Sequence, residues 1–322
     1  MLYHEVRFKT TDGTELHGRV YEPERPGRGP GLTLCPGFNC PITMINLPAC
    51  AAALQKHGVT VLLYDPRGIG ASGGLPRNDI DPPQCVADMS DALTYLLTLP
   101  SVDPNQAGMF GFSFGGSVAL TAVSVDPRSC FVIAAAPVTD LDFTSPAQRT
   151  RVLQKYAQDR ESQVRGNAAF TVPLVNERGE NAVGFGHGLD TKLYAKLVKG
   201  GRDLAPGHVN RTTLATYYRL AQWTPWPLWK HLGTGHNGNA KSGLRGALFI
   251  VPGDDTVTYA AMQRKYFDEI DGGPGFHKSK IEVDGAGHED LFTDRNLNVA
   301  IGGVVRFLEH ISQPNSAAPS LL

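Results

Sequence analysis

The stretch AGMFGFSFGG, residues 107–116, decides the fold of this chain. Its first six residues form a short apolar run, as in a buried strand, and residues 114–124 continue as an apolar helix. Between the two stands the pattern G-x-S-x-G, with Ser113 at its centre. The flanking glycines allow a tight turn without a Cβ clash, which lifts the Ser113 hydroxyl to a helix N-terminus, where negative charge is favoured. The pattern predicts a nucleophilic serine; the structural alternative is a tight turn that merely uses glycine.

Short apolar runs and helical periodicity alternate on both sides of this stretch. This alternation is typical of an α/β protein with a mostly parallel sheet covered by helices on both faces. The turn residues Asp12-Gly13 lie between two alternating segments, which indicates an N-terminal hairpin. We expect hairpin strands at 6–9 and 16–21, further strands at 32–35, 59–65, 131–137, 246–252 and 280–283, and further helices near 51–57, 84–98, 259–270 and 296–311.

The alternation stops between residues 140 and 240. This segment carries charges, glycines, three tryptophans and short helical pieces, but no strong strand pattern. Long excursions inside a compact domain usually serve function. We therefore expect an α/β core formed by residues 1–139 and 241–322, with residues 140–240 inserted as a cap, or lid, over the carboxyl edge of the sheet.

A serine hydroxyl needs a base to take its proton, and the base needs an acid to orient it. His288 follows Gly285-Ala286-Gly287 just after the last strand, where it can reach Ser113. The acid should follow the preceding strand, where Asp254 and Asp255 stand side by side. We favour Asp255, three residues beyond the strand, and keep Asp254 and Asp140 as alternatives.

Acyl chemistry also needs two backbone N–H groups aimed at the developing oxyanion. One should come from Phe114, the residue after the nucleophile, and the other from Phe38 in the loop Pro36-Gly37-Phe38-Asn39. The glycine-rich loop 67–72 lacks the pattern of a phosphate-binding loop, so we interpret it as structural.

Three tryptophans, Trp223, Trp226 and Trp229, recur at spacing i, i+3, i+6, which predicts one face of a helix broken by prolines. They form either the core of the cap or an apolar roof over a substrate. The cap histidines are expected to contact substrate or to face solvent; they are His187, His208, His231 and His236.

The charge balance argues against nucleic acid and anionic membranes as partners. The 322 residues carry a formal net charge of -1, and no run of basic residues occurs. No stretch approaches the roughly 20 apolar residues of a transmembrane helix, and the N-terminal segment has no apolar signal-peptide region. We therefore expect a cytoplasmic protein with reduced cysteines, no metal and no cofactor, acting on a small molecule; a homodimer stays open.

Four segments resemble one branch of the α/β-hydrolases, the thiohydrolases and polyketide transferases of fungal secondary metabolism. They are PGFNC (36–40), YDPRGIGASGGLPRNDIDP (64–82), LPSVDPNQAGMFGFSFGG (99–116) and NRTTLATYY (210–218). The resemblance spans about residues 5–310 and implies an α/β-hydrolase fold with Ser113, Asp255 and His288 as catalytic triad. Two residues depart from common hydrolase patterns: Pro36 replaces a histidine, and Pro252 replaces a strand-end glycine.

The resemblance implies an acyl hydrolase or acyltransferase acting on an ester or thioester of an apolar, polyketide-like acyl group. Delivery of this group by a carrier protein or a synthase stays open. Water, an alcohol or an internal nucleophile then accepts the acyl group. Two other classes stay open. One is a cyclase, lyase or C–C bond-cleaving enzyme on the same scaffold, because one fold hosts many chemistries. The other is a non-catalytic binding protein.

Overall fold

The computed structural model describes residues 3–24, 26–139, 142–176, 180–185, 208–234 and 243–312. Within these ranges eight strands form one sheet in the order β1-β2-β4-β3-β5-β6-β9-β10. The first two, β1 (His4–Lys9) and β2 (Glu15–Tyr21), form the expected antiparallel hairpin. The others are β3 (Gly29–Cys35), β4 (Thr60–Tyr64), β5 (Val102–Phe112), β6 (Phe131–Ala135), β9 (Gly246–Pro252) and β10 (His277–Val283).

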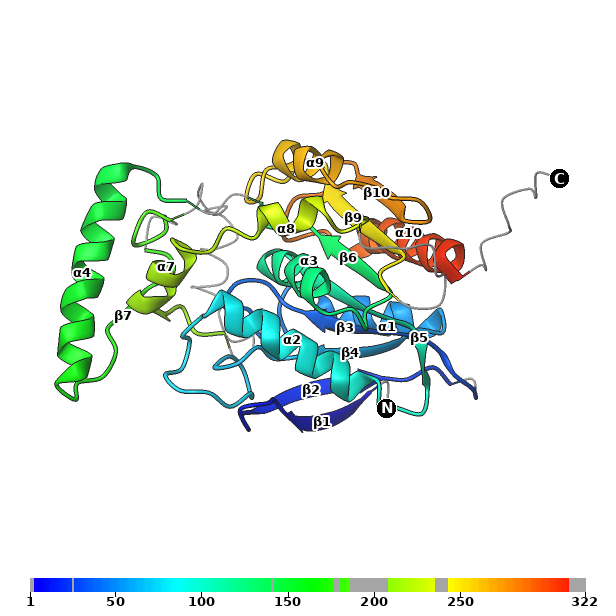
Figure 1. Ribbon diagram of the computed structural model, residues 1–322, viewed down its shortest axis with the longest axis horizontal. Helices are drawn as coiled ribbons and strands as arrows, with labels where there is room; N and C mark the ends of the chain where they lie inside the picture. Colours follow the sequence, from blue (N-terminus) through cyan, green and yellow to red (C-terminus); the bar gives the residue numbers. More distant parts are fainter. Residues whose placement is uncertain are drawn as a thin grey trace.

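From β4 to β10 all neighbouring strands of the sheet run parallel. This confirms the expected α/β-hydrolase fold, with a mostly parallel sheet between two helical layers (Figure 1). The helices α1 (Leu47–Lys56) and α10 (Asp294–Ser312) cover one face. The other face is covered by α2 (Pro82–Leu96), α3 (Phe114–Val125) and α9 (Ala260–Asp268).

The central strands are apolar on both faces because each face is covered by helices. Every residue of β4, β6 and β9 is buried. Burial of α3 is nearly as complete, from Phe114 to Val123. The elements on either side of Ser113 therefore lie at the centre of the core, and the turn between them opens at the carboxyl edge of the sheet.

The segment between β6 and β9, called the insert below, contributes no strand to the eight-stranded sheet in its described part. Its described helices are α4 (Pro146–Val164), α7 (Leu214–Leu220) and α8 (Trp226–Lys230). In Figure 1 α4 stands farthest from the sheet, with α7 between it and the core. The expectation of a strandless segment is wrong, because β7 (Thr171–Val172) pairs antiparallel with β8 (Thr212–Thr213). Pairs of two residues are too short to produce a recognisable alternation in the sequence.

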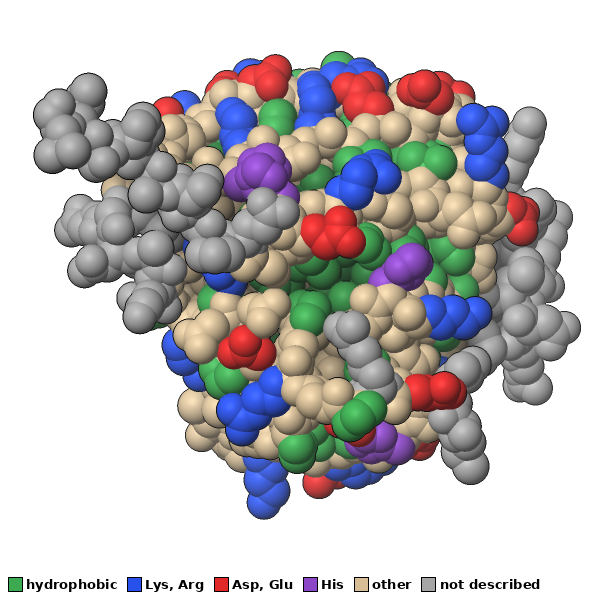
Figure 2. All heavy atoms as spheres, turned by 90° about the vertical axis from the view of Figure 1, so that its right-hand side faces the viewer, with side chains coloured by type: hydrophobic (Ala, Val, Ile, Leu, Met, Phe, Trp, Pro, Cys, Tyr) green, Lys and Arg blue, Asp and Glu red, His purple; other side chains and the backbone are tan. Residues whose placement is uncertain are grey.

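The surface agrees with the near-neutral charge. On the face of the molecule that lies away from α4, the described Lys and Arg side chains alternate with Asp and Glu (Figure 2). None of the helices in the described ranges is both long and apolar enough to cross a membrane. All five cysteines are free thiols, and four of them are buried.

Candidate active site

Ser113 occupies the turn between β5 and α3 in a backbone conformation that few residues adopt. Its φ is 56° and its ψ is -123°. Four backbone hydrogen bonds hold it. The Ser113 N–H donates to Ala135 O on β6 at 2.8 Å, and Ser113 O accepts from the N–H groups of Gly116, Ser117 and Val138 at 2.8, 3.3 and 3.3 Å. Strained residues persist only where their surroundings over-determine them, and such residues cluster at functional sites.

The glycines of the motif are required by close backbone contacts. A Cβ on Gly111 would overlap the backbone of Gly115, and a Cβ on Gly115 would overlap the carbonyl oxygens of Cys35 and Pro36. The turn therefore packs directly on the end of β3. This contact brings the loop after β3 beside the serine, since a Cβ on Gly37 would lie 3.2 Å from Ser113 Cβ.

His288 lies in the loop after β10, and its ring bridges Ser113 and Asp255. The Nε2 atom is 2.9 Å from Ser113 Oγ, and the Nδ1 atom is 2.9 Å from Asp255 Oδ2. A carboxylate only accepts hydrogen bonds, so Nδ1 carries the proton and Nε2 accepts from the serine hydroxyl. All three residues are less than 9% exposed. The arrangement is the one that a serine nucleophile, its base and an orienting acid require.

Asp255 is held as a carboxylate by donors from its own loop. Val257 N–H and Thr258 N–H donate to Oδ1 at 2.8 and 2.9 Å, and the Thr258 hydroxyl donates to Oδ2 at 2.7 Å. Burial alone raises the pKa of Asp255, but the hydrogen bond and charge of His288 and the Thr258 donors outweigh it and lower the pKa to about 2. Asp255 therefore stays ionised at neutral pH.

The other candidate acids are placed differently. Asp254 is exposed, and its N–H donates to Ala286 O at 2.9 Å, which ties the loop after β9 to the loop that carries His288. Of the two adjacent aspartates, only Asp255 contacts the histidine. Asp140 lies outside the described residues.

Gln263 on α9 contributes to the site, and the sequence reasoning missed it. Its Nε2 donates to Asp255 Oδ2 at 3.0 Å and to Thr258 Oγ1 at 2.9 Å, and its side chain is fully buried. A signal was available, because Gln263 is a polar residue on the face of α9 that buries Ala260 and Phe267. A buried polar side chain needs a hydrogen-bond partner. Asp255, eight residues earlier in the chain, is such a partner for Gln263.

The two residues expected to supply the N–H groups of the oxyanion hole both lie close to the serine. Phe114 opens α3 directly after Ser113, and Phe38 follows Gly37 in the loop after β3. Their rings pack edge to face, with centroids 5.7 Å apart. Neither N–H donates to another residue in the described part of the chain, so both are free to bind a developing negative charge.

The three tryptophans connect the site to the insert, but not on one helix. Trp223 lies in the turn after α7, and α8 begins only at Trp226. The break that the prolines predict falls between Trp223 and Trp226, because Pro225 and Pro227 restrict the backbone to a new helix start. The Trp223 ring packs on Phe114 at 5.4 Å between centroids. Trp229 is 1% exposed, and its indole N–H donates to Thr121 Oγ1 on α3 at 3.1 Å.

Two insert histidines can be placed. His231 has a side chain that is 70% exposed, whereas His208 Nδ1 lies 3.3 Å from Asn39 O, beside the Phe38 loop. His187 and His236 lie outside the described residues.

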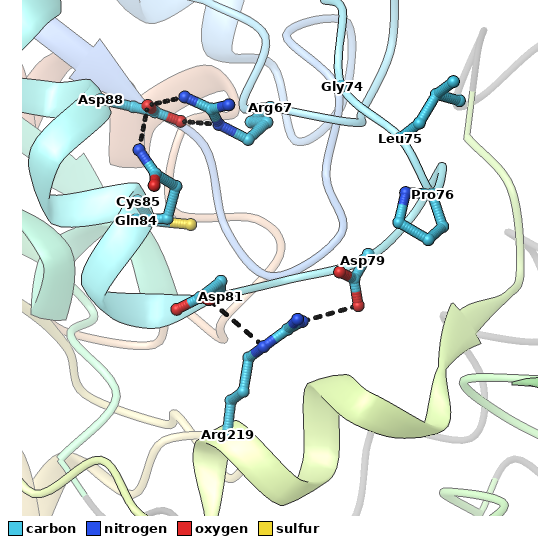
Figure 3. Close-up of a pocket in the computed structure, with 10 residues that line it drawn as sticks. All are labelled: Arg67, Gly74, Leu75, Pro76, Asp79, Asp81, Gln84, Cys85, Asp88 and Arg219. Carbon is cyan, nitrogen blue, oxygen red and sulfur yellow. Dashed lines mark hydrogen bonds and ion pairs between the residues drawn. The ribbon is translucent and has the colours of Figure 1, made fainter. Parts of the chain in front are cut away.

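The glycine-rich loop after β4 is attached to neighbouring segments through Arg67. Arg67 binds Asp88 through two nitrogens, at 2.6 and 2.9 Å, and its Nη1 donates to Asp12 Oδ2 at 2.7 Å. A cavity of about 150 Å³ lies beside this loop (Figure 3). Its lining includes two arginine–carboxylate ion pairs, one formed by Arg67 and one by Arg219 of α7. Ser113 is not among the residues that line this cavity.

Comparison with known proteins gives a consistent family relationship. The model of the alpha/beta hydrolase family matches residues 34–300. A thiohydrolase of Eupenicillium brefeldianum is 38% identical over 294 residues, which cover 91% of this chain and 90% of the relative. A polyketide transferase of Aspergillus fumigatus is 35% identical over 308 residues, covering 94% of this chain and 97% of the relative.

The fold comparison agrees. The structure of DcsB in complex with its substrate analogue superposes with a TM-score of 0.83 at 31% identity. The superposition covers 96% of this chain and 98% of that one. The similarity therefore includes the insert as well as the sheet.

Proposed function

Because the chain belongs to the alpha/beta hydrolase family and resembles its thiohydrolases and polyketide transferases, we propose that it is a serine-dependent acyl hydrolase or acyltransferase. The observation that carries the proposal is the Ser113–His288–Asp255 relay, with both links at 2.9 Å. The substrate is an ester or thioester of an apolar, polyketide-like acyl group. No cofactor takes part in the proposed reaction.

In the first half-reaction Ser113 Oγ attacks the acyl carbonyl carbon while His288 Nε2 takes the hydroxyl proton. The carbonyl oxygen becomes an oxyanion, which the N–H groups of Phe38 and Phe114 stabilise. Asp255 stabilises the imidazolium through Nδ1 without taking its proton. The tetrahedral intermediate then expels the thiolate or alkoxide, which receives the proton from His288, and an acyl ester remains on Ser113.

The second half-reaction repeats these steps with an acceptor. His288 Nε2 removes a proton from water, an alcohol or a hydroxyl of the acyl chain, and the acceptor oxygen attacks the acyl ester. The bond between the acyl carbon and Ser113 Oγ then breaks, and His288 returns the proton to Oγ. Closure over a site excludes bulk water and so decides which acceptor reacts. Ser113 is 8% exposed and His288 7%, a degree of burial that suits transfer to an acceptor bound beside the acyl group.

We assign the insert as a lid whose aromatic side chains line the acyl site. Trp223 is the first of these, because its ring contacts Phe114, the residue next to the nucleophile. Trp226 lies between the other two tryptophans, with its ring centroid 6.3 Å from Trp223 and 4.9 Å from Trp229. Trp229 already uses its only polar atom on Thr121, so its part is to attach the lid to α3.

A serine-reactive fluorophosphonate tests the nucleophile. We expect covalent labelling of the wild-type chain at Ser113 and none of a folded Ser113→Ala variant, which should also lose activity by several orders of magnitude. Incubation with acyl thioesters of different chain length should give a mass increase of one acyl group on Ser113. Labelling that persists in Ser113→Ala would reject the proposed nucleophile.

Chain-length dependence tests the acyl wall. Each CH₂ buried against apolar side chains contributes about 0.8 kcal/mol, so kcat/KM for p-nitrophenyl esters should rise with acyl length until the site is full. Trp223→Ala should flatten this rise and spare hydrolysis of the acetate ester. An unchanged length dependence in folded Trp223→Ala would contradict the assignment of Trp223.

A further inference from the structure

The loop that carries the Phe38 N–H is a tight turn whose shape depends on Asn39. The Cys40 N–H donates to Gly37 O at 3.2 Å, and Asn39, the third residue of the turn, has a φ of 53°. Such a turn needs a residue that tolerates positive φ, and asparagine is one of the few besides glycine. The backbone on the C-terminal side of Phe38 is thereby determined.

The Asn39 side chain does more than permit the turn. It is 2% exposed, and both of its polar atoms are bound to other segments. Its Nδ2 donates to Val209 O of the insert at 2.8 Å, and its Oδ1 accepts from Asn78 Nδ2 at 2.9 Å. A third contact comes from His208, whose Nδ1 lies 3.3 Å from Asn39 O. Since a carbonyl only accepts, His208 is the donor.

The insert segment that supplies Val209 continues into β8 and is attached to the core loop that supplies Asn78. Thr212 Oγ1 donates to Asn78 O at 2.7 Å, and the Ile80 N–H donates to Thr216 Oγ1 at 2.8 Å. Arg219 of α7 pairs with Asp79 at 2.7 Å and Asp81 at 3.2 Å, as Figure 3 shows. Insert, core loop and Phe38 loop thus form one continuous polar contact, with Asn39 at its inner end.

We propose that Asn39 is a positioning residue that couples attachment of the insert to the alignment of the oxyanion hole. This inference rests on the proposed function, in which Phe38 N–H binds the oxyanion. When the insert is attached, Val209 O and Asn78 hold the Asn39 side chain in place. Asn39 in turn fixes the conformation of the turn, and this conformation sets the direction in which the Phe38 N–H points. Donors of this kind act only when they point at the place where charge develops.

Asn39→Gly separates the two roles of the residue, because glycine keeps the positive φ and loses both side-chain hydrogen bonds. We expect kcat for a p-nitrophenyl ester to fall about 10- to 100-fold, somewhat less than removal of a whole oxyanion donor costs. KM should stay near the wild-type value. The inhibition constant of an alkyl trifluoromethyl ketone, whose adduct with serine carries an oxyanion, should rise by a comparable factor. Binding of the matching alcohol, which forms no adduct, should not change.

Asn78→Gly is the second variant. Asn78 also has positive φ, at 58°, and its replacement removes the hydrogen bond to Asn39 Oδ1 but keeps the carbonyl that binds Thr212. It should change kcat and ketone binding in the same direction, and the double variant should show less than the sum of the two effects. Asn167→Ala is the control, because it removes a hydrogen bond inside the insert, to Ser162 Oγ, that involves neither loop.

Wild-type kcat and ketone affinity in folded Asn39→Gly and Asn78→Gly would overturn the inference. A rise in KM and in the inhibition constant of the alcohol as large as the loss in kcat would also overturn it, because it would show a role in shaping the binding pocket. The proposed function fails separately: the ketone would not inhibit the wild type, or Ser113→Ala would still hydrolyse the ester. That outcome would remove both proposals.

Discussion

At the scale of single residues, the key question is which of two adjacent aspartates orients His288. Asp255 is buried and bound to His288 Nδ1, whereas Asp254 faces solvent. We predict that Asp255→Asn lowers kcat by about three to four orders of magnitude, because an amide in place of the carboxylate favours the wrong histidine tautomer. Asp254→Asn should keep most of the activity. Steady-state rates of the two purified variants check this, and a larger loss in Asp254→Asn would show that the other aspartate acts.

The lowered pKa of Asp255 also predicts how this residue affects stability as pH changes. A carboxyl with a pKa of about 2 in the folded chain and about 3.9 in the unfolded chain stabilises the fold above the unfolded value. That stabilisation is lost as pH falls toward the folded value. The free energy of unfolding of the wild type minus that of Asp255→Asn should therefore be constant near neutral pH and decrease below about pH 4. Denaturant titrations of both proteins at several pH values measure it; a difference that grows on acidification would contradict the assignment.

At the scale of elements, the β5–α3 turn and the end of β3 are packed backbone against backbone. A methyl group on Gly115 would overlap the carbonyl oxygens of Cys35 and Pro36, and neither can move without displacing β3. Gly115→Ala should lower the free energy of unfolding by about 1–3 kcal/mol or more, as other overpacked sites do, and reduce activity. Gly272→Ala is the matched control, because a Cβ there meets nothing within 4 Å. If denaturant titrations gave the two variants the same free energy of unfolding, Gly115 would not be in close contact with the end of β3.

At the scale of the whole molecule, Trp229 joins the insert to the core through one hydrogen bond to Thr121 on α3. Trp229→Phe keeps the aromatic packing and removes this bond, at a cost of about 1 kcal/mol. We predict faster amide exchange in α7 and α8 with unchanged protection of β5 and β6, since the insert can loosen while the sheet stays folded. Trp226→Phe serves as control. Uniform loss of protection across the chain would mean that insert and core unfold as one unit.

Much of the core could be predicted from the sequence, because its signals are local. The motif glycines, the apolar runs of β4, β6 and β9 and the helical periodicity each depend on neighbours a few residues away. The order of the relay residues along the chain follows from the order of strands, so Ser113 and His288 were predictable candidates. Asp255 was preferred to Asp254 by its distance from the strand end alone.

Only the tertiary structure decided which distant residues meet. Asn39 and Val209 are separated by 170 positions, and Trp229 and Thr121 by 108. No local pattern encodes such contacts, because hydrogen bonds across the fold depend on where whole elements pack and not on periodicity. The pairing of β7 with β8 has the same origin. The sequence by itself determined the sheet, the turn at Ser113 and the candidate chemistry; packing of the insert on the core decided what surrounds them.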